Sequence, residues 1–539
     1  MKNKIYLLAS LFAAVLTLGS CSDFLDETPN KSGSAYIYHM DQLYGLTGGV
    51  QLYLGQDASA GSTQMGVMCP FMTEQYFLGD GIGISPDYFF RGGMDSPTRK
   101  YDLYCWGSDF MKTQTSASNM TWQPAWERIY TFNTVLENMD KVIQTTAAIR
   151  NQVEGEARFG RAFYHFMLLT QYCRWQEDAP GIGYREGTEP GAIPTRQTVG
   201  YTLGRIYEDL QLAQDALTKA GRTEFDFEHN TRPTVPTVQA FRARVDLYRG
   251  NYESALTNAV DALKGHNELA DFQQDSYYEL SSSYDIQFKD QNGNVDESKT
   301  IQGYTPKKLW DLNSRAVAEY RELFLPCMSC SSYAMAIPIS ESFYNLFTDK
   351  VNDARWKYFY NSGYSAMYAS HLYTENNGGG ISWETQQWLQ PSDLCTYMRF
   401  IGQWGTSFIV GMTTAEMYLI QAECLARKGQ AGDAAGILKT LRRTRFSDLT
   451  AADNIGGSVQ EVLDERSREM GPFWRFFDIK RLNGAENAGI EIRRKILADP
   501  ADPTSVTELV IPANDPRWAL PFNDVECQLM GWEQNEGWK

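Results

Sequence analysis

Histidine is scarce in this chain of 539 residues, which contains only five: His39, His165, His229, His266 and His371. None of them stands beside a cysteine or a second histidine at the spacing of metal ligands, so the sequence predicts no zinc site. The GxSxG, Walker and HExxH motifs of common catalytic and nucleotide-binding sites are also missing from it. We therefore predict a protein that is not an enzyme and that uses no metal or other cofactor.

Positive charge and long apolar runs are also in short supply. Lys and Arg number 49 against 66 Asp and Glu, which gives a formal net charge of -17. Nucleic-acid binding rests on cationic contacts to phosphate, so we predict no nucleic-acid partner. After the N-terminal segment no stretch approaches the roughly 18 uninterrupted apolar residues of a membrane-spanning helix, and none is expected.

The N-terminus carries the pattern of an exported protein. Lys2 and Lys4 precede an apolar run over 5–18, and small residues follow directly before Cys21. This order is typical of a secretory signal. The stretch Leu-Gly-Ser-Cys resembles a bacterial lipobox, whose cysteine becomes the acylated N-terminus. We predict a lipoprotein signal over 1–20 and lipidation at Cys21, with an ordinary signal peptide as the alternative.

Helical periodicity dominates the rest of the chain. Apolar residues at i, i+3 and i+4 spacing predict amphipathic helices over 122–143, 152–172, 201–217, 235–248, 252–263, 413–428 and 433–443. The segments 240–263 and 415–443 share one plan: a helix ends in Arg-Gly or Lys-Gly, a short turn follows, and alanines mark close-contact positions of a second helix. This plan resembles a tetratricopeptide unit, although any helical hairpin could show it.

Two long regions, 61–118 and 265–412, lack this periodicity and are rich in Gly, Ser, Asn, Tyr and Trp. Long structured loops on a helical body usually carry function. Flat aromatic faces can cover the apolar C–H faces of a sugar while nearby polar groups bind its hydroxyls. For any one ring, core packing is the competing interpretation. The candidate ligand-binding residues are Tyr101, Trp106, Tyr284, Trp310, Trp383, Trp388 and Trp404.

One stretch within the second region has oxygen-bearing residues at alternate positions. Asp290, Asn292, Asn294 and Asp296 of KDQNGNVDES have the alternation of a calcium loop. The glycine stands at the wrong place for such a loop and the closing glutamate is missing. The pattern therefore favours an Asn-Gly turn.

Several short motifs, in this order along the chain, resemble the SusD/RagB family of surface lipoproteins. They are CSDFLDETP (21–29), WERIYTFNTVLENMDKV (126–142), VEGEARFGRAFYHFMLLTQY (153–172), RQTVGYTLGRIYEDLQLAQDAL (196–217), RPTVPTVQAFRARVDLYRGNYESAL (232–256), TTAEMYLIQAECLARKG (413–429), VLDERSREMGPFWRFFDIKR (462–481), LPFNDVE (520–526) and QNEGW (534–538). Departures from the family pattern occur in KTLRRTRF, MGPFWR and QNEGW, where we expect altered packing.

The resemblance implies a mostly α fold with about four tetratricopeptide-like helix pairs and a loop-rich region packed on them. It implies a single domain over 21–539, with the helical scaffold at about 36–264 and 413–539 and the ligand-binding region at about 265–412. It also implies partly buried ion pairs among Glu465, Arg466, Glu469, Arg475 and Asp478 that tie the C-terminal helices to the repeats.

The function implied by the resemblance is capture of a glycan at the outer-membrane surface and its delivery to a SusC-like TonB-dependent transporter. Three alternatives stay open. The ligand could be a peptide, as in the RagB branch, or the chain could be a structural lid of the transporter without ligand affinity. A hydrolase with a carboxylate pair is the third, because sequence cannot place two carboxylates at a catalytic separation.

Overall fold

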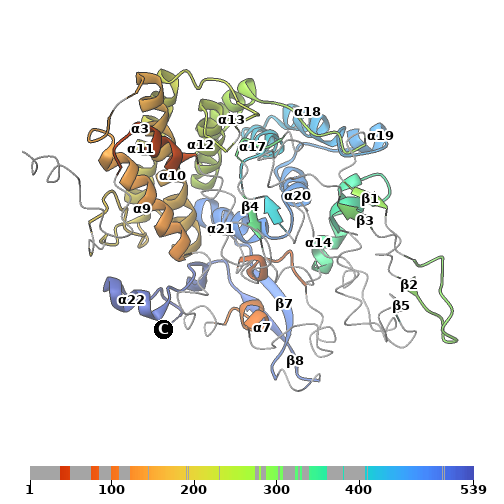
Figure 1. Cartoon of the computed structure of the whole chain (residues 1–539). Coiled ribbons are helices and arrows are strands. Elements are labelled where there is room, and N and C mark those ends of the chain that lie inside the picture. The colour runs from red at the N-terminus through yellow and green to blue at the C-terminus, as the bar shows by residue number, and fades with distance from the viewer. Residues whose placement is uncertain are drawn as a thin grey trace, which may run out of the picture.

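The structure is a computed structural model of the whole chain (Figure 1). It describes residues 37–48, 75–83, 99–107, 122–143, 145–189, 191, 194–229, 231–273, 278–280, 287–300, 304–306, 322–325, 328–330, 339–360, 380–381, 407–409, 411–499, 502 and 504–538. None of the helices within these ranges is long and apolar enough to cross a membrane.

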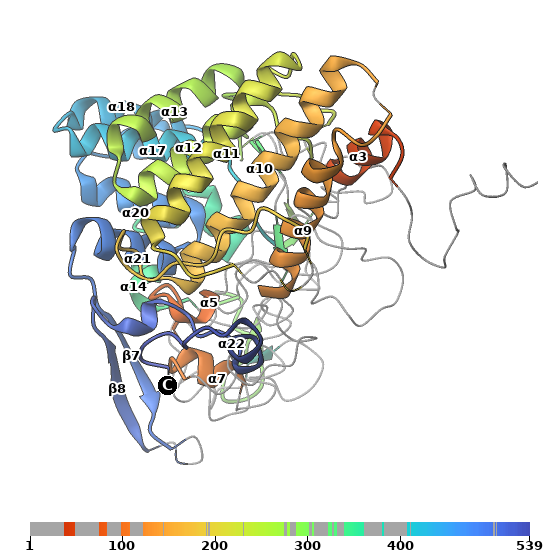
Figure 2. The ribbon, with the colours of Figure 1, turned by 90° about the vertical axis from the view of Figure 1, so that its left-hand side faces the viewer.

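The N-terminal half of the scaffold is a row of packed helices, in which α10, α11 and α12 lie side by side (Figure 2). Its members are α3 (Met40–Thr47), α9 (Trp122–Asn138), α10 (Ala147–Tyr172), α11 (Val199–Lys219), α12 (Val235–Arg249) and α13 (Tyr252–Gly265). The long α10 begins where the Thr146 side chain accepts the Ile149 backbone N–H, which satisfies one of the unpaired donors of a helix start. From Tyr164 to Tyr172 every residue of α10 is buried, so this helix is the centre of the core.

The turn between α12 and α13 explains the predicted hairpin. Gly250 adopts a left-handed conformation with φ of 78°, which glycine accepts at little cost and which ends α12. The side chain of Asn251 then accepts the Ser254 backbone N–H and begins α13. Ala255 and Ala259 are completely buried against the neighbouring helices. Small side chains at these positions let the two helices approach closely, as the tetratricopeptide-like plan predicted.

The C-terminal half repeats this construction. It comprises α17 (Thr414–Arg427), α18 (Ala431–Arg442), the short α19 (Leu449–Asp453), α20 (Val459–Met470) and α21 (Trp474–Glu486). In α20 the hydroxyl of Ser458 and the carboxylate of Glu461 exchange hydrogen bonds with each other's backbone N–H groups, which fixes the start of the helix. The prediction of a mostly α protein with tetratricopeptide-like helix pairs is confirmed.

Short strands and short helices complete the described structure. The strand pairs are β1 (Tyr278–Leu280) with β3 (Tyr304–Pro306), β2 (Gln287–Phe288) with β5 (Gly380–Ile381), β4 (Met328–Cys330) with β6 (Ser407–Ile409), and β7 (Ile492–Leu497) with β8 (Val506–Ile511). Further short elements are α5 (Gln75–Leu78), α7 (Arg99–Tyr104), α14 (Glu341–Asn345), the π-helical turn η4 (Trp356–Tyr360), the 3-10 turn η6 (Pro516–Trp518) and α22 (Asp524–Met530). Three of the strand pairs lie within 265–412, and two of them, β2–β5 and β4–β6, join segments of this region that are far apart in sequence.

Candidate functional site

Most of the predicted ligand-binding aromatics fall where no structural statement is made. Tyr284, Trp310, Trp383, Trp388 and Trp404 lie outside the described residues, as does the predicted lipidation site Cys21. The backbone of Tyr101 belongs to α7. The role of these aromatic residues in ligand binding therefore stays a prediction. The candidate site is defined by the described residues where the two loop regions meet.

Trp106 is a core residue in the structure. Its side chain is 2% exposed. The indole packs edge-on against Trp518 with ring centroids 5.1 Å apart, and its N–H donates to the Leu78 carbonyl over 3.2 Å. The ring thus holds the start of the first loop region against the C-terminal segment. This environment favours the core-packing interpretation of Trp106 over ligand contact.

Arg494 of β7 holds the same loop region in place, and the sequence did not lead us to predict this role. Its buried guanidinium donates to the backbone carbonyls of Phe77, Leu78, Gly79 and Tyr104 at 2.8–3.0 Å. Hydrogen bonds from a charged donor are stronger than neutral ones, so this residue fixes α5 and α7 on the β7–β8 hairpin. The signal that could have indicated such a role is an arginine at the alternate position between Ile492 and Ile496, on the buried face of a short strand.

The two loop regions share one base. Ile82 forms an antiparallel bridge with Ile339, and the Ser340 backbone N–H donates to the Gly81 carbonyl over 2.9 Å. The approach is so close that a Cβ atom on Gly83 would lie 2.6 Å from the Ser340 Cα atom. Regions 61–118 and 265–412, which are far apart in sequence, therefore meet at these interior positions.

A polar cavity of about 210 Å³ lies at this junction. An ion pair between Asp80 and Arg475, 2.8 Å apart, connects the first loop region to α21. Burial alone would lower the pKa of Arg475, but Asp80 outweighs it and raises this pKa above its ordinary value, so the guanidinium stays charged. The cavity is lined by Asp80, Ser342, Phe343, Leu346, Gln460, Asp464, Ser467 and Arg475. Carboxylate, amide, hydroxyl and guanidinium groups of this kind suit a hydroxylated ligand.

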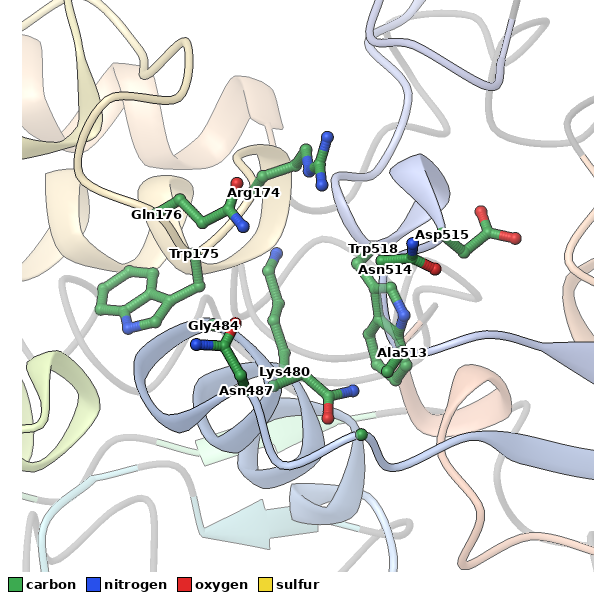
Figure 3. A pocket seen from close by; sticks show the side chains of 12 residues that line it. Arg174, Trp175, Gln176, Lys480, Gly484, Asn487, Ala513, Asn514, Asp515 and Trp518 are labelled. Carbon is green, nitrogen blue, oxygen red and sulfur yellow. The ribbon is translucent and has the colours of Figure 1, made fainter.

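A second cavity, of about 240 Å³, lies between the end of α10, the helix α21 and the segment before η6 (Figure 3). Lys480 enters it from α21, and its ammonium group donates to the carbonyl oxygens of Thr170 and Gln171 at 2.6 and 3.3 Å. Burial lowers the pKa of Lys480 to about 7. The other lining residues are Arg174, Trp175, Gln176, Asn483, Gly484, Asn487, Gly489, Ala513, Asn514, Asp515 and Trp518.

The stretch with the calcium-like alternation forms the predicted turn. Gly293 has φ of 85°, and its backbone N–H donates to the Asp290 carbonyl. The Asp290 carboxylate accepts the backbone N–H groups of Asn292 and Asn294 at 2.8 and 2.9 Å. These donors occupy the carboxylate that a cation would need. Over the described part of the chain, no group of three or more His, Cys, Asp or Glu residues is placed to hold a metal ion.

Comparisons with known proteins agree with this fold. A family model described as "Starch-binding associating with outer membrane" (SusD-like) matches residues 94–247, and the model of the SusD family (SusD_RagB) matches residues 396–519. No curated protein sequence matches the chain significantly.

Solved structures of low sequence identity share the fold over nearly their whole length. A SusD superfamily protein from Bacteroides thetaiotaomicron is 18% identical with a TM-score of 0.59, over 92% of this chain and 98% of that one. A putative sugar binding protein from Bacteroides vulgatus is 16% identical, TM-score 0.57, over 94% and 100%. Surface glycan-binding protein A from Bacteroides uniformis is 13% identical, TM-score 0.57, over 92% and 98%.

The two family models match two separate parts of one chain, and together they account for about half of it. Their order agrees with the order of the motifs in the sequence, and the helical scaffold accommodates both segments. The chain therefore belongs to the SusD/RagB family.

Proposed function

We propose that the mature protein is a surface-exposed lipoprotein of the outer membrane that binds glycan nutrients and delivers them to a SusC-like TonB-dependent transporter. The observation that carries this proposal is the match to two models of one family, the first described as starch-binding and associating with the outer membrane. Lipid attachment at Cys21 would hold the chain at the membrane, and the acidic stretch after it would lead the body away from the surface.

The described base of the loop regions supports a binding role. The bridge between Ile82 and Ile339 brings the backbones of the two regions together, and the cavity beside it offers hydroxyl-binding groups. Aromatic rings carried by anchored loops, with polar groups between them, suit the alternating apolar and hydroxylated faces of a sugar. Such a surface performs no bond chemistry, so we propose binding without turnover.

The first experiment is calorimetric titration of a soluble form that starts at Ser22. The ligands are a panel of polysaccharides, oligosaccharides and peptides, and the products are analysed after each titration. Saturable binding of one glycan class without cleavage is the expected result. Binding of a peptide instead of a glycan would support the RagB-like alternative, and cleavage products would indicate a hydrolase. No binding to any ligand would leave the alternative of a lid that works only with its transporter.

Single substitutions test the predicted aromatics. We expect Trp383→Ala, Trp388→Ala or Trp404→Ala to weaken glycan binding by about tenfold or more for rings that stack on the ligand, since buried aromatic anchors dominate binding energy. Tyr201→Ala is the matched control, because this ring is 50% exposed on α11 of the scaffold. Unchanged affinity in every loop variant would contradict an aromatic binding platform.

The transporter partnership needs a separate test. Affinity purification of the full-length lipoprotein from its own outer membrane is expected to bring down a large β-barrel protein in constant ratio. Absence of such a protein, together with retained glycan binding, would contradict delivery to a transporter and leave a free surface glycan binder.

A further inference from the structure

The cavity beside Lys480 is lined by two basic side chains, Arg174 and Lys480, and one acidic side chain, Asp515, in a chain whose net charge is -17. Arg174 and Lys480 converge on it from the end of α10 and from α21 (Figure 3). Its position is separate from the junction of the two loop regions, and the glycan-binding proposal leaves it without a role. A cationic cavity in an acidic protein concentrates anions locally against the overall charge.

The acidic residue in the lining does not neutralise this pair. The Asp515 carboxylate accepts two hydrogen bonds from the Arg517 guanidinium, at 2.9 and 2.7 Å, and a third from the Arg517 backbone N–H. Burial would raise the pKa of Asp515, but the hydrogen bonds and charge of Arg517, with a smaller contribution from the charge of Arg174, outweigh it and lower the pKa. The carboxylate is therefore charged and is held mainly by Arg517. The half-buried Arg174 uses its backbone carbonyl to accept the Gln176 backbone N–H over 3.0 Å, and its guanidinium has a long-range charge interaction with Asp515. Among the described residues no side-chain hydrogen bond of Arg174 is seen, so its guanidinium fork is available.

Lys480 has donor capacity left for a ligand. Its amine uses two donors on the Thr170 and Gln171 carbonyls at the end of α10, and an ammonium group has three. Because burial lowers the pKa of Lys480 to about 7, the amine is only partly charged at neutral pH. A neighbouring anion favours the charged form of an amine. An anionic ligand would therefore favour the ammonium form of Lys480 and accept its third hydrogen bond.

The walls and the size limit the ligand further. The indoles of Trp175 and Trp518 are 7% and 4% exposed, and their N–H groups are already bonded to the Tyr248 and Pro512 carbonyls. They therefore offer apolar surface. The side chains of Gln176, Asn487 and Asn514 supply amides at the rim. A volume of about 240 Å³ is below the roughly 300–1,000 Å³ of pockets for drug-sized ligands, which leaves room for one sugar ring or one terminal amino acid.

We propose that this cavity binds the carboxylate of a small polar ligand, with the guanidinium of Arg174 and the amine of Lys480 as its partners and the two indoles as walls. A guanidinium matches a carboxylate with two parallel hydrogen bonds, and the lysine adds a point charge. The carboxylate can belong to a uronic acid or to the C-terminus of a short peptide. This inference does not depend on the aromatic loop residues or on glycan capture by them.

The test is calorimetric titration of the soluble form with two matched pairs of probes. One pair is D-galacturonate and D-galactose, and the other is the dipeptide Gly-Leu and its C-terminal amide. For at least one of the two probe pairs, the acid should bind at least about tenfold more tightly than its neutral counterpart. The reason is that the neutral probe cannot form the charge-assisted hydrogen bonds. Which pair shows the difference identifies the source of the carboxylate. Acetate is titrated as well, to separate a fitted ligand from an isolated anion.

Arg174→Gln is the decisive variant, because its half-buried side chain can be replaced without loss of a described contact. This substitution should weaken binding of the acid by about tenfold and leave the affinity for the neutral probe and for any neutral glycan unchanged. Arg242→Gln is the matched control: this half-buried arginine on α12 bonds only to glutamines of α11 and lies outside the cavity lining.

Three results would overturn the proposal: no binding of either acid, equal binding of acid and neutral counterpart, or full affinity in Arg174→Gln. If acetate bound as tightly as both acids, the cavity would recognise an isolated carboxylate only, and the proposal of a fitted ligand would be overturned. Failure of glycan capture shows as lost binding of neutral oligosaccharides, which this cavity does not affect, so the two failures are distinguishable.

Discussion

Glu465 shows how one carboxylate can organise a buried cluster. It is completely buried on α20 and pairs with Arg355, Arg442 and Arg468 at 2.8–2.9 Å. Burial alone would raise the pKa of Glu465, but the three guanidiniums outweigh it and hold the pKa well below its ordinary value. The carboxylate is therefore charged in the folded protein, and it supplies a counter-charge to each of the three arginines.

Glu465→Gln is expected to lower the free energy of unfolding by about 3–5 kcal/mol, because it removes the counter-charge of the Arg442 and Arg468 guanidiniums. Arg355 keeps its pairs with Asp353 and Glu469. Urea unfolding followed by circular dichroism measures the difference. Glu208→Gln is the control, since Glu208 is 59% exposed in its pair with Arg205 and such surface pairs contribute at most about 1 kcal/mol. Equal effects of the two substitutions would contradict a structural role for the buried cluster.

The same carboxylate predicts a pH dependence. A pKa below the ordinary 4.5 means that the stabilisation is complete above about pH 4.5 and is lost as the pH falls towards the folded-state value. Asp478 and Glu423, which pair with Arg481, have lowered pKa values as well and act in the same direction. We expect the free energy of unfolding to fall between pH 5 and pH 3, and Glu465→Gln to flatten this fall. An unchanged slope in the variant would contradict the assignment.

Among the elements, α10 is the most tightly enclosed by its neighbours. A Cβ atom on Gly160 would overlap the Phe132 ring of α9, and one on Gly155 would lie 2.6 Å from the Leu217 Cγ atom of α11. The two glycines therefore set the distance between α10 and the helices on either side. By contrast, Gly204 is exposed on α11, and a Cβ atom there would meet nothing within 4 Å.

This difference predicts opposite effects of one chemical change. Gly160→Ala should destabilise the protein by about 1–3 kcal/mol through overpacking. Gly204→Ala should stabilise it by about 0.5–1 kcal/mol, because alanine loses less backbone entropy in a helix. Urea midpoints of the two variants at constant m-value measure both effects. Stabilisation by Gly160→Ala would show that α9 and α10 are less closely packed than the structure indicates.

Helix positions were predictable where an amphipathic repeat coincides with a cap. The helix expected over 235–248 is α12, Val235–Arg249, and its end follows from Gly250. The start of α10 at Ala147 was missed, because Thr146 begins the helix several residues before the apolar repeat becomes regular. The β7–β8 hairpin was missed too, because strands of six residues carry a weak pattern and Arg494 interrupts the apolar face of β7.

At the scale of the whole molecule, arginines connect segments that are distant in the chain. Arg445, just after α18, donates to Glu322 of the loop-rich region and to Glu469 of α20, at 2.6 and 3.0 Å. Arg244 of α12 binds Glu416 of α17 over 2.6 Å. Of the residues expected to form ion pairs around the C-terminal helices, Arg466 pairs with Asp478 over 3.0 Å and with Glu416 over 3.4 Å. The Arg445 pair with Glu322 connects the loop-rich region to the C-terminal half of the scaffold, and the Arg244 pair with Glu416 connects the two halves.

We propose on this basis that residues 21–539 fold as one domain. The expected result is a single thermal transition whose calorimetric enthalpy equals the van't Hoff enthalpy, with coincident curves from near- and far-ultraviolet circular dichroism. Two separate transitions would show that the loop-rich region and the helical scaffold unfold independently, and would contradict the single-domain proposal.

Local pattern was enough to determine the class of the fold, the tetratricopeptide-like pairs and the family. Helical repeats, caps and Arg-Gly turns act over a few residues, so their order in the chain is visible without a structure. The charged motifs of α20 and α21 likewise indicated buried pairs, although their partners Glu416 and Arg355 could not be named.

Only the tertiary structure decided which distant groups meet. The junction of Ile82 with Ile339, the core position of Trp106 and the convergence of Arg174 with Lys480 each join residues far apart in the sequence. Nothing in a local pattern specifies such pairs, because they arise when whole helices and loops pack and exclude water. The cationic cavity is therefore a property of the fold, although the chain as a whole is acidic.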